Sequence, residues 1–137
     1  MEHQFILSGA STKEERYREF LSQFESLVRD VDDEIAVLAN AAAALCEAFG
    51  FFWVGFYRVK GDCLILGPFQ GSVACYRIKK GKGVCGTAWE QGHTIVVPDV
   101  DKFPGHIACS SLSRSEIVVP VFSSGKEPVV KCVLDID

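Results

Sequence analysis

The sequence lacks an excess of basic residues and lacks any long hydrophobic run. Its 137 residues include 14 Lys and Arg against 18 Asp and Glu, which gives a net charge of −4. Nucleic acid is therefore not expected as a partner, because binding its phosphates requires a basic surface. No run approaches the roughly 18 apolar residues that span a bilayer, and the N-terminus does not have the pattern of a signal peptide. We expect a cytoplasmic protein that does not contact a membrane.

The spacings that usually hold a structural metal are also missing. Six Cys and three His are present, but no C-x-x-C or H-x-x-x-H pair occurs. A Walker loop is absent, and no Ser-His-Asp arrangement stands out by spacing. The sequence therefore predicts neither a metal nor another cofactor.

What is present is a globular composition, with 48% hydrophobic and 23% charged residues. The length fits one domain over residues 1–137. A capping box from Ser11 to Glu14 predicts a first helix, and a second helix follows Asp33 and ends at Gly50. About six strands come next, interrupted by a short helix at 83–92 and a long loop at 98–113. This order predicts an α+β fold, an antiparallel sheet with the N-terminal helices packed on one face.

Three cysteines, Cys75, Cys85 and Cys109, lie among glycines and other small residues. In the reducing cytoplasm, such thiols form disulfides that are mostly transient or catalytic. Cys85 begins the short helix, where the helix dipole favours a thiolate, and Cys109 has His106 and Arg114 nearby in sequence. We expect redox chemistry if the three thiols meet in the fold. The alternative for each of them is a half-buried structural thiol.

Carboxylates and aromatic residues form a second group of candidates. Asp135 and Asp137 project on the same side of the last strand, about 7 Å apart at a rise of 3.3 Å per residue. Glu116 opens the preceding strand and completes an acidic cluster if the two strands are neighbours. Trp53 and Tyr57 share a face of the first strand and offer an apolar wall. The alternatives are solvated strand-end carboxylates and ordinary core aromatics.

The sequence resembles the GAF-domain free methionine-(R)-sulfoxide reductases over residues from about 17 to the end. The resemblance rests on seven segments, which are 53–57 (WVGFY), 66–71 (LGPFQG), 74–75 (AC), 81–88 (GKGVCGTA), 103–109 (FPGHIAC), 113–120 (SRSEIVVP) and 133–137 (VLDID). It implies a GAF fold around a small pocket. It also implies reduction of free L-methionine (R)-sulfoxide to methionine, with thioredoxin as the reductant.

The resemblance also implies roles for individual residues. Cys109 matches the nucleophile that attacks the sulfoxide sulfur and is left as a sulfenic acid, and Cys75 and Cys85 match the thiols that resolve it into a disulfide. The matches for the substrate-binding residues are Glu116, Asp135 and Asp137 for the ammonium, and Trp53 and Tyr57 for the aromatic side of the pocket. The division of labour between Cys75 and Cys85 stays open.

One departure from the family pattern concerns the C-terminus. Family members continue past the final strand into a helix, and the sequence printed here stops at Asp137. Two other functions stay open, a non-catalytic GAF sensor of a small ligand and a redox-responsive interaction module. A homodimer is one of the assembly states that the sequence leaves open.

Overall fold

The computed structural model describes residues 7, 12–106 and 113–137. The helices are α1 (Lys13–Val28), α2 (Glu34–Phe49), α3 (Gly83–Gln91) and the short 3-10 helix η1 (Val100–Lys102). The strands are β1 (Val54–Lys60), β2 (Cys63–Gln70), β3 (Arg77–Lys79), β4 (Ile95–Val97), β5 (Glu116–Phe122) and β6 (Val130–Ile136). Within these described residues, no helix has both the length and the apolar character needed to cross a membrane.

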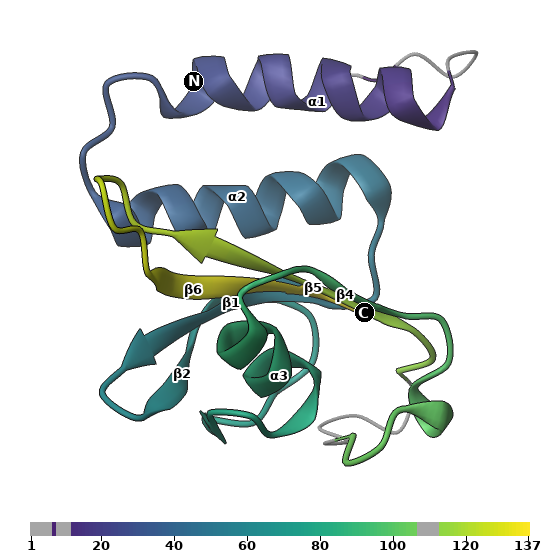
Figure 1. Cartoon of the computed structure of the whole chain (residues 1–137). Helices are drawn as coiled ribbons and strands as arrows, with labels where there is room; N and C mark the ends of the chain where they lie inside the picture. The colour runs from purple at the N-terminus through teal and green to yellow at the C-terminus, as the bar shows by residue number, and fades with distance from the viewer. Residues whose placement is uncertain (1–6, 8–11, 107–112) are drawn as a thin grey trace.

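The six strands form one sheet in the order β3-β2-β1-β6-β5-β4, and every neighbouring pair is antiparallel. The helices α1 and α2 lie on one side of this sheet, and α3 lies on the other (Figure 1). The predicted α+β class, the antiparallel sheet and the position of the N-terminal helices are confirmed. The pairing of β1 with β6 brings residues far apart in the sequence to the centre of the sheet.

The two faces of the sheet have separate cores. Side chains alternate along a strand, so Phe56 and Cys132 face α2, where they pack with Leu38, Ala41 and Ala42. Their neighbours Tyr57 and Val133 face the opposite side and join the core beneath α3. Cys132 is a core residue, since its exposed fraction is 2%.

The predicted end residues of α2 are confirmed, whereas the residue that caps α1 lies one position later than predicted. Asp33 caps α2, where its carboxylate accepts a hydrogen bond from the Ala36 amide at 2.9 Å, and Gly50 ends the helix with a φ of +66°. For α1 the cap is Thr12 and not the predicted Ser11, which lies outside the described residues. The Thr12 hydroxyl accepts from the Glu15 amide, one residue later than the expected partner. Two adjacent hydroxyl residues both fit the capping pattern, so sequence alone does not choose between them.

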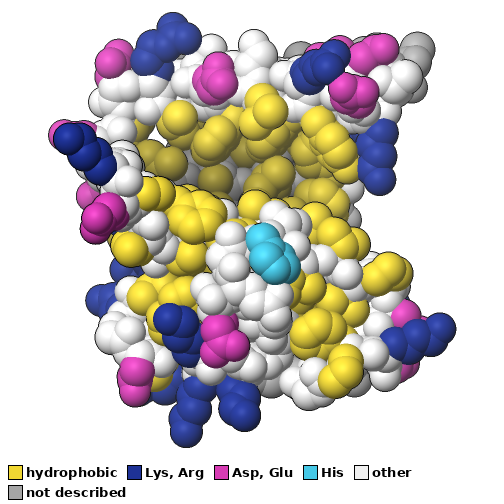
Figure 2. All heavy atoms as spheres, in the orientation of Figure 1, with side chains coloured by type: hydrophobic (Ala, Val, Ile, Leu, Met, Phe, Trp, Pro, Cys, Tyr) yellow, Lys and Arg dark blue, Asp and Glu magenta, His cyan; other side chains and the backbone are white. Residues whose placement is uncertain are grey.

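The apolar side chains of α1 are only partly buried. Phe20 is the one buried residue of this helix, whereas 42% of Tyr17 and 55% of Leu21 are exposed. These side chains line an apolar groove of about 1000 Å³ between α1, α2 and the strands β4 to β6. Figure 2 shows hydrophobic side chains gathered in the hollow between α1 and the sheet. The helix α1 therefore packs against α2 and overhangs the sheet.

We expect the Asp33→Ala substitution to lower the free energy of unfolding by about 1 kcal/mol, because the first turn of α2 loses its cap. Urea unfolding followed by circular dichroism measures this change. The matched control is Asp32→Ala, which removes an exposed carboxylate one residue earlier and should stay within about 0.5 kcal/mol of the unchanged chain. Equal losses in both variants would contradict the assignment of the cap.

Candidate functional site

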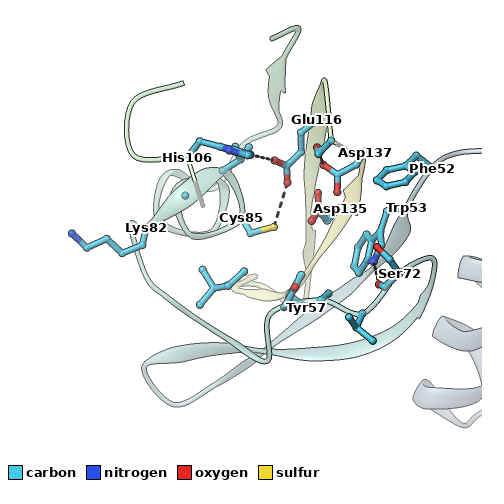
Figure 3. Close-up of a pocket in the computed structure, with 16 residues that line it drawn as sticks. Phe52, Trp53, Tyr57, Ser72, Lys82, Cys85, His106, Glu116, Asp135 and Asp137 are labelled. Atoms are coloured by element: carbon cyan, nitrogen blue, oxygen red, sulfur yellow. Dashed lines mark hydrogen bonds and ion pairs between the residues drawn. The ribbon is translucent and has the colours of Figure 1, made fainter. Parts of the chain in front are cut away.

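A small pocket lies on the α3 side of the sheet, with a volume of about 50 Å³. Its walls come from the ends of β1, β5 and β6, from α3 and from the segment between β2 and β3 (Figure 3). The lining residues are Phe52, Trp53, Tyr57, Ser72, Val73, Ala74, Ile78, Lys82, Gly83, Val84, Cys85, His106, Ser113, Glu116, Asp135 and Asp137. Pockets for drug-sized ligands measure roughly 300–1,000 Å³. The volume therefore suits a small chemical group.

Three carboxyl groups form one wall of this pocket. The strands β5 and β6 are direct neighbours, so Glu116 at the start of β5 lies beside Asp135 and Asp137 at the end of β6. Asp135 is paired with Val118 on one side and with Gly55 on the other, which places it in the middle of the sheet. The acidic cluster expected from the sequence is therefore present in the structure. What it binds stays a prediction.

Two stacked aromatic rings form the opposite wall. The ring centroids of Trp53 and Tyr57 lie 6.1 Å apart, and the Trp53 ring also stacks on Phe69. The Trp53 indole donates to the Ser72 carbonyl, and the Tyr57 hydroxyl donates to the Cys75 carbonyl, both at 3.0 Å. Hydrogen bonds of this kind hold both rings in place, so the wall is rigid and apolar.

Glycine is required at position 55, between the two aromatic residues. A Cβ atom there would overlap Phe69 and would lie 2.8 Å from the Trp53 ring. The missing side chain therefore allows the indole to lie over the strand beside Asp135, the partner of Gly55 in the sheet.

Cys85 lies in the first turn of α3 and is buried, with 3% of its surface exposed. Its Sγ is 3.9 Å from Glu116 Oε2, and the thiol points toward the acids in Figure 3. We expected the helix N-terminus to lower the pKa of this thiol. The structure contradicts that expectation, because burial and then the charges of Asp135 and Glu116 raise the pKa well above its usual value. Cys85 is therefore a protonated thiol at neutral pH.

The segment around Cys85 also has the spacing G-x-G-x-x-G, in Gly81, Gly83 and Gly86. In dinucleotide-binding folds this spacing joins a strand to a helix within a parallel βαβ unit. Here the sheet is antiparallel throughout. Gly86 has a packing reason instead, since a Cβ there would overlap the Lys79 carbonyl.

Burial also changes the protonation of the acids. The pKa of Asp135 is raised well above its usual range by burial, and then by Glu116 and Asp137. The pKa of Asp137 is raised to about 7 by burial and by Glu116, against a hydrogen bond that it accepts from Ser113 at 3.1 Å. In the described part of the chain, the one basic side chain in contact with these acids is that of His106, with Nε2 3.3 Å from Glu116 Oε1. The wall therefore attracts a positively charged ligand group.

The other two candidate cysteines have different positions. Cys75 is half-buried, follows the pocket residue Ala74 and takes part in a disulfide. Cys109 lies outside the described residues. Cys46, Cys63, Cys85 and Cys132 are free thiols.

Sequence reasoning missed part of the pocket. Ser113 donates a hydrogen bond to Asp137, and the Ser72 carbonyl accepts one from Trp53. His106 contacts Glu116. The lining also includes Phe52 and Lys82. We had considered His106 only as a cation near Cys109 in sequence. A contact between a loop residue and a strand residue leaves no local spacing signal in the sequence. The sequence also gives no spacing signal for a group of possible metal ligands. This group consists of one atom each from Cys85, Glu116 and Asp135, and these atoms lie within 4.8 Å of one another.

Comparison with known proteins gives a consistent result. The GAF domain family model matches residues 33–133. GAF domain-containing protein A of Dictyostelium discoideum is 58% identical over 92% of this chain and 78% of its own length. The free methionine-R-sulfoxide reductase of Saccharomyces cerevisiae is 43% identical over 95% of this chain and 76% of its own length. A solved structure of free methionine-R-sulfoxide reductase from Neisseria meningitidis, in complex with its substrate, is 58% identical with a TM-score of 0.89, over 98% of this chain and 80% of that one.

The chain belongs to the GAF-domain free methionine-R-sulfoxide reductase family. The predicted GAF fold is thereby confirmed, and the resemblance seen in the sequence is correct. Enzymes of this family are oxidoreductases, so a pocket that combines thiols and acids is consistent with membership.

We expect the free energy of unfolding to fall as the pH rises from about 4 to about 7, and to fall less in Asp137→Asn. The pKa of Asp137 is 3.8 when unperturbed and about 7 in the fold, so between these values the folded chain holds a proton that the unfolded chain has lost. Because Asp137 is partly exposed, we expect the variant to gain only about 1 kcal/mol at neutral pH. Urea unfolding across this pH range measures both quantities.

The amide in Asp137→Asn still offers an oxygen to the Ser113 hydroxyl, so the variant changes charge with little change in shape. Glu25→Gln, which removes an exposed carboxylate on α1, is the matched control and should follow the unchanged chain. Identical pH profiles for Asp137→Asn and the unchanged chain would contradict the raised pKa.

Proposed function

We propose that this chain reduces free L-methionine (R)-sulfoxide to methionine through a cysteine nucleophile. The observation that carries the proposal is the pocket itself, where a rigid aromatic wall faces three carboxyl groups beside a disulfide-bonded cysteine. Support also comes from relatives named as free methionine-R-sulfoxide reductases at 43% and 58% identity. The small volume of the pocket suits the sulfoxide end of one amino acid side chain.

In this proposal the acids select a free amino acid. The ammonium of the substrate pairs with the acidic wall formed by Glu116, Asp135 and Asp137, while the methyl group beside the sulfur packs on Trp53 and Tyr57. A methionine residue inside a protein has no ammonium group, so it would leave these buried acids without a partner.

The chemistry proceeds in three balanced steps. The Cys109 thiol attacks the sulfoxide sulfur, the oxygen passes to the cysteine, and methionine and a sulfenic acid result. The Cys75 thiol then attacks the sulfenic acid, which forms a disulfide and releases water. Thioredoxin reduces this disulfide by thiol exchange and becomes oxidised itself, in keeping with a cytoplasmic location.

The burial of the thiols supports Cys75 over Cys85 as the resolving residue. Nucleophilic attack needs an accessible thiolate, and Cys85 is buried with a raised pKa. Cys75 is half-buried and is in a disulfide, whereas Cys85 is free. We therefore propose that Cys75 resolves the sulfenic acid formed on Cys109, and that Cys85 is a residue of the pocket wall.

The alternative functions are a non-catalytic sensor of a small ligand and a redox-responsive interaction module. An assay with the substrate distinguishes both of them from a reductase. Purified protein is mixed with the resolved R and S sulfoxides of free methionine and a dithiol reductant, and methionine is measured. We expect methionine from the free R sulfoxide alone. A sensor would bind the compound and form no methionine, and reduction of both isomers at equal rates would contradict the proposed pocket geometry.

Cysteine variants test the order of the thiol steps. We expect Cys109→Ser to form no methionine, and Cys75→Ser to release one methionine per chain and then stop, because its sulfenic acid is not resolved. Rapid-quench measurement of methionine per chain distinguishes these outcomes. Cys63→Ser, which removes a buried thiol of β2 away from the pocket lining, is the control and should turn over normally. A single-turnover burst in Cys85→Ser instead would show that Cys85 resolves the intermediate.

A further inference from the structure

Three residues of the pocket are potential metal ligands, and the proposed reaction uses two of them, Glu116 and Asp135, to bind the substrate. One ligand atom each from Cys85, Glu116 and Asp135 lies within 4.8 Å of the other two, and all three residues are buried. They come from α3, β5 and β6, three elements that the core packs against one another. Figure 3 shows the thiol and the two carboxyl groups converging on one point of the pocket.

A second observation points to a ligand at this position. Asp135 is 6% exposed, and its Oδ1 atom has no hydrogen-bond partner within the described residues. Leaving a buried acceptor unpaired costs about 1–3 kcal/mol. A cation between Asp135 and its neighbours would satisfy this oxygen. Glu116 is already oriented for the same role, because His106 binds its Oε1 and Oε2 is directed toward Cys85.

The types of ligand atom favour a zinc-like ion over calcium or magnesium. A sulfur with two carboxylate oxygens suits Zn²⁺, whereas Ca²⁺ and Mg²⁺ prefer sites made of oxygen alone. Zn–S and Zn–O bonds of about 2.3 and 2.1 Å in a tetrahedron place sulfur and oxygen ~3.6 Å apart. The distance between Cys85 Sγ and Glu116 Oε2 is 3.9 Å. This pair therefore needs little movement to bind the ion, and the other two pairs lie within 4.8 Å. Three protein ligands leave a fourth position for water.

Within the described part of the chain, the other acidic and basic residues that line the pocket are Lys82, His106 and Asp137. His106 is engaged with Glu116 on the side away from Cys85, as an outer partner that orients a ligand. Binding of the metal displaces the proton of the Cys85 thiol into solution, because the thiolate is the form that binds.

We propose that Cys85, Glu116 and Asp135 form a binding site for Zn²⁺ or a similar thiophilic divalent ion, and that the bound ion blocks the substrate pocket. The inhibitory part rests on the proposed reductase function, because the ion and the substrate would use the same carboxyl groups. Metal binding itself does not depend on that function.

Cobalt titration tests the binding. Co²⁺ replaces Zn²⁺ at such sites and gives a thiolate-to-metal absorption band when sulfur binds. The full chain is reduced with a phosphine, which avoids thiol chelators, and Cys75 and Cys109 are replaced by Ser so that neither contributes. We expect the band to saturate at one Co²⁺ per chain and to disappear when Zn²⁺ is added.

Variants in the same background locate the site. Cys85→Ser should lose the band, and Glu116→Gln and Asp135→Asn should weaken Co²⁺ binding at least about tenfold. Cys132→Ser and Cys63→Ser, which remove other buried thiols, are the matched controls and should keep it. If Cys85→Ser loses its native circular dichroism, the site is tested by Co²⁺ binding to the near-isosteric Asp135→Asn variant instead. A missing band, a band that survives in Cys85→Ser, or Co²⁺ binding unchanged in Asp135→Asn would overturn the proposal.

Enzyme kinetics test the inhibition separately. With the unchanged chain, Zn²⁺ should raise the KM for free methionine (R)-sulfoxide at least about tenfold with little change in kcat, as expected for a competitor. An unchanged KM despite a saturated metal site would overturn the inhibitory part. If the chain has no reductase activity, the proposed function fails, while the cobalt band still reports whether the metal site exists.

Discussion

The burial of three carboxyl groups and a thiol around one small pocket is the constraint on which the rest of the site depends. Ionised carboxylates are costly to bury without positive partners, and within the described part of the chain the one basic side chain in contact with them is that of His106. The acids respond by holding protons, as the raised pKa values of Asp135 and Asp137 indicate. The pocket is therefore poised for a ligand that brings positive charge.

The sheet separates this chemistry from the part of the molecule that provides only packing. On β1 and β6, Phe56 and Cys132 face α2, while Tyr57 and Asp135 face the pocket. The surroundings of two buried cysteines therefore differ, because Cys132 has mainly apolar neighbours and Cys85 has acidic ones. The side chains that could do chemistry lie on the face covered by α3.

Much of the fold follows from local signals in the sequence. Asp33 and Gly50 mark the ends of α2, and the alternation in the last strand correctly separates Cys132 from Asp135. These signals depend on residues close together in the chain. The acidic cluster was predictable only on the condition that β5 and β6 are neighbours, which the structure provides. The environment of Cys85 and the contact between His106 and Glu116 depend on how separate elements pack, and helix position alone led to the wrong sign for the thiol pKa.

The position of β6 has a consequence for how the protein is made. This strand is the last in the sequence printed above, yet it lies between β1 and β5 at the centre of the sheet. A nascent chain that has emerged from the ribosome up to β5 has two separate groups of strands and no strand to join them. Such long-range pairing is slow and leaves strand edges open in the meantime. Translation must therefore pass Asp137 before Cys85 and the other lining residues synthesised earlier can form the pocket.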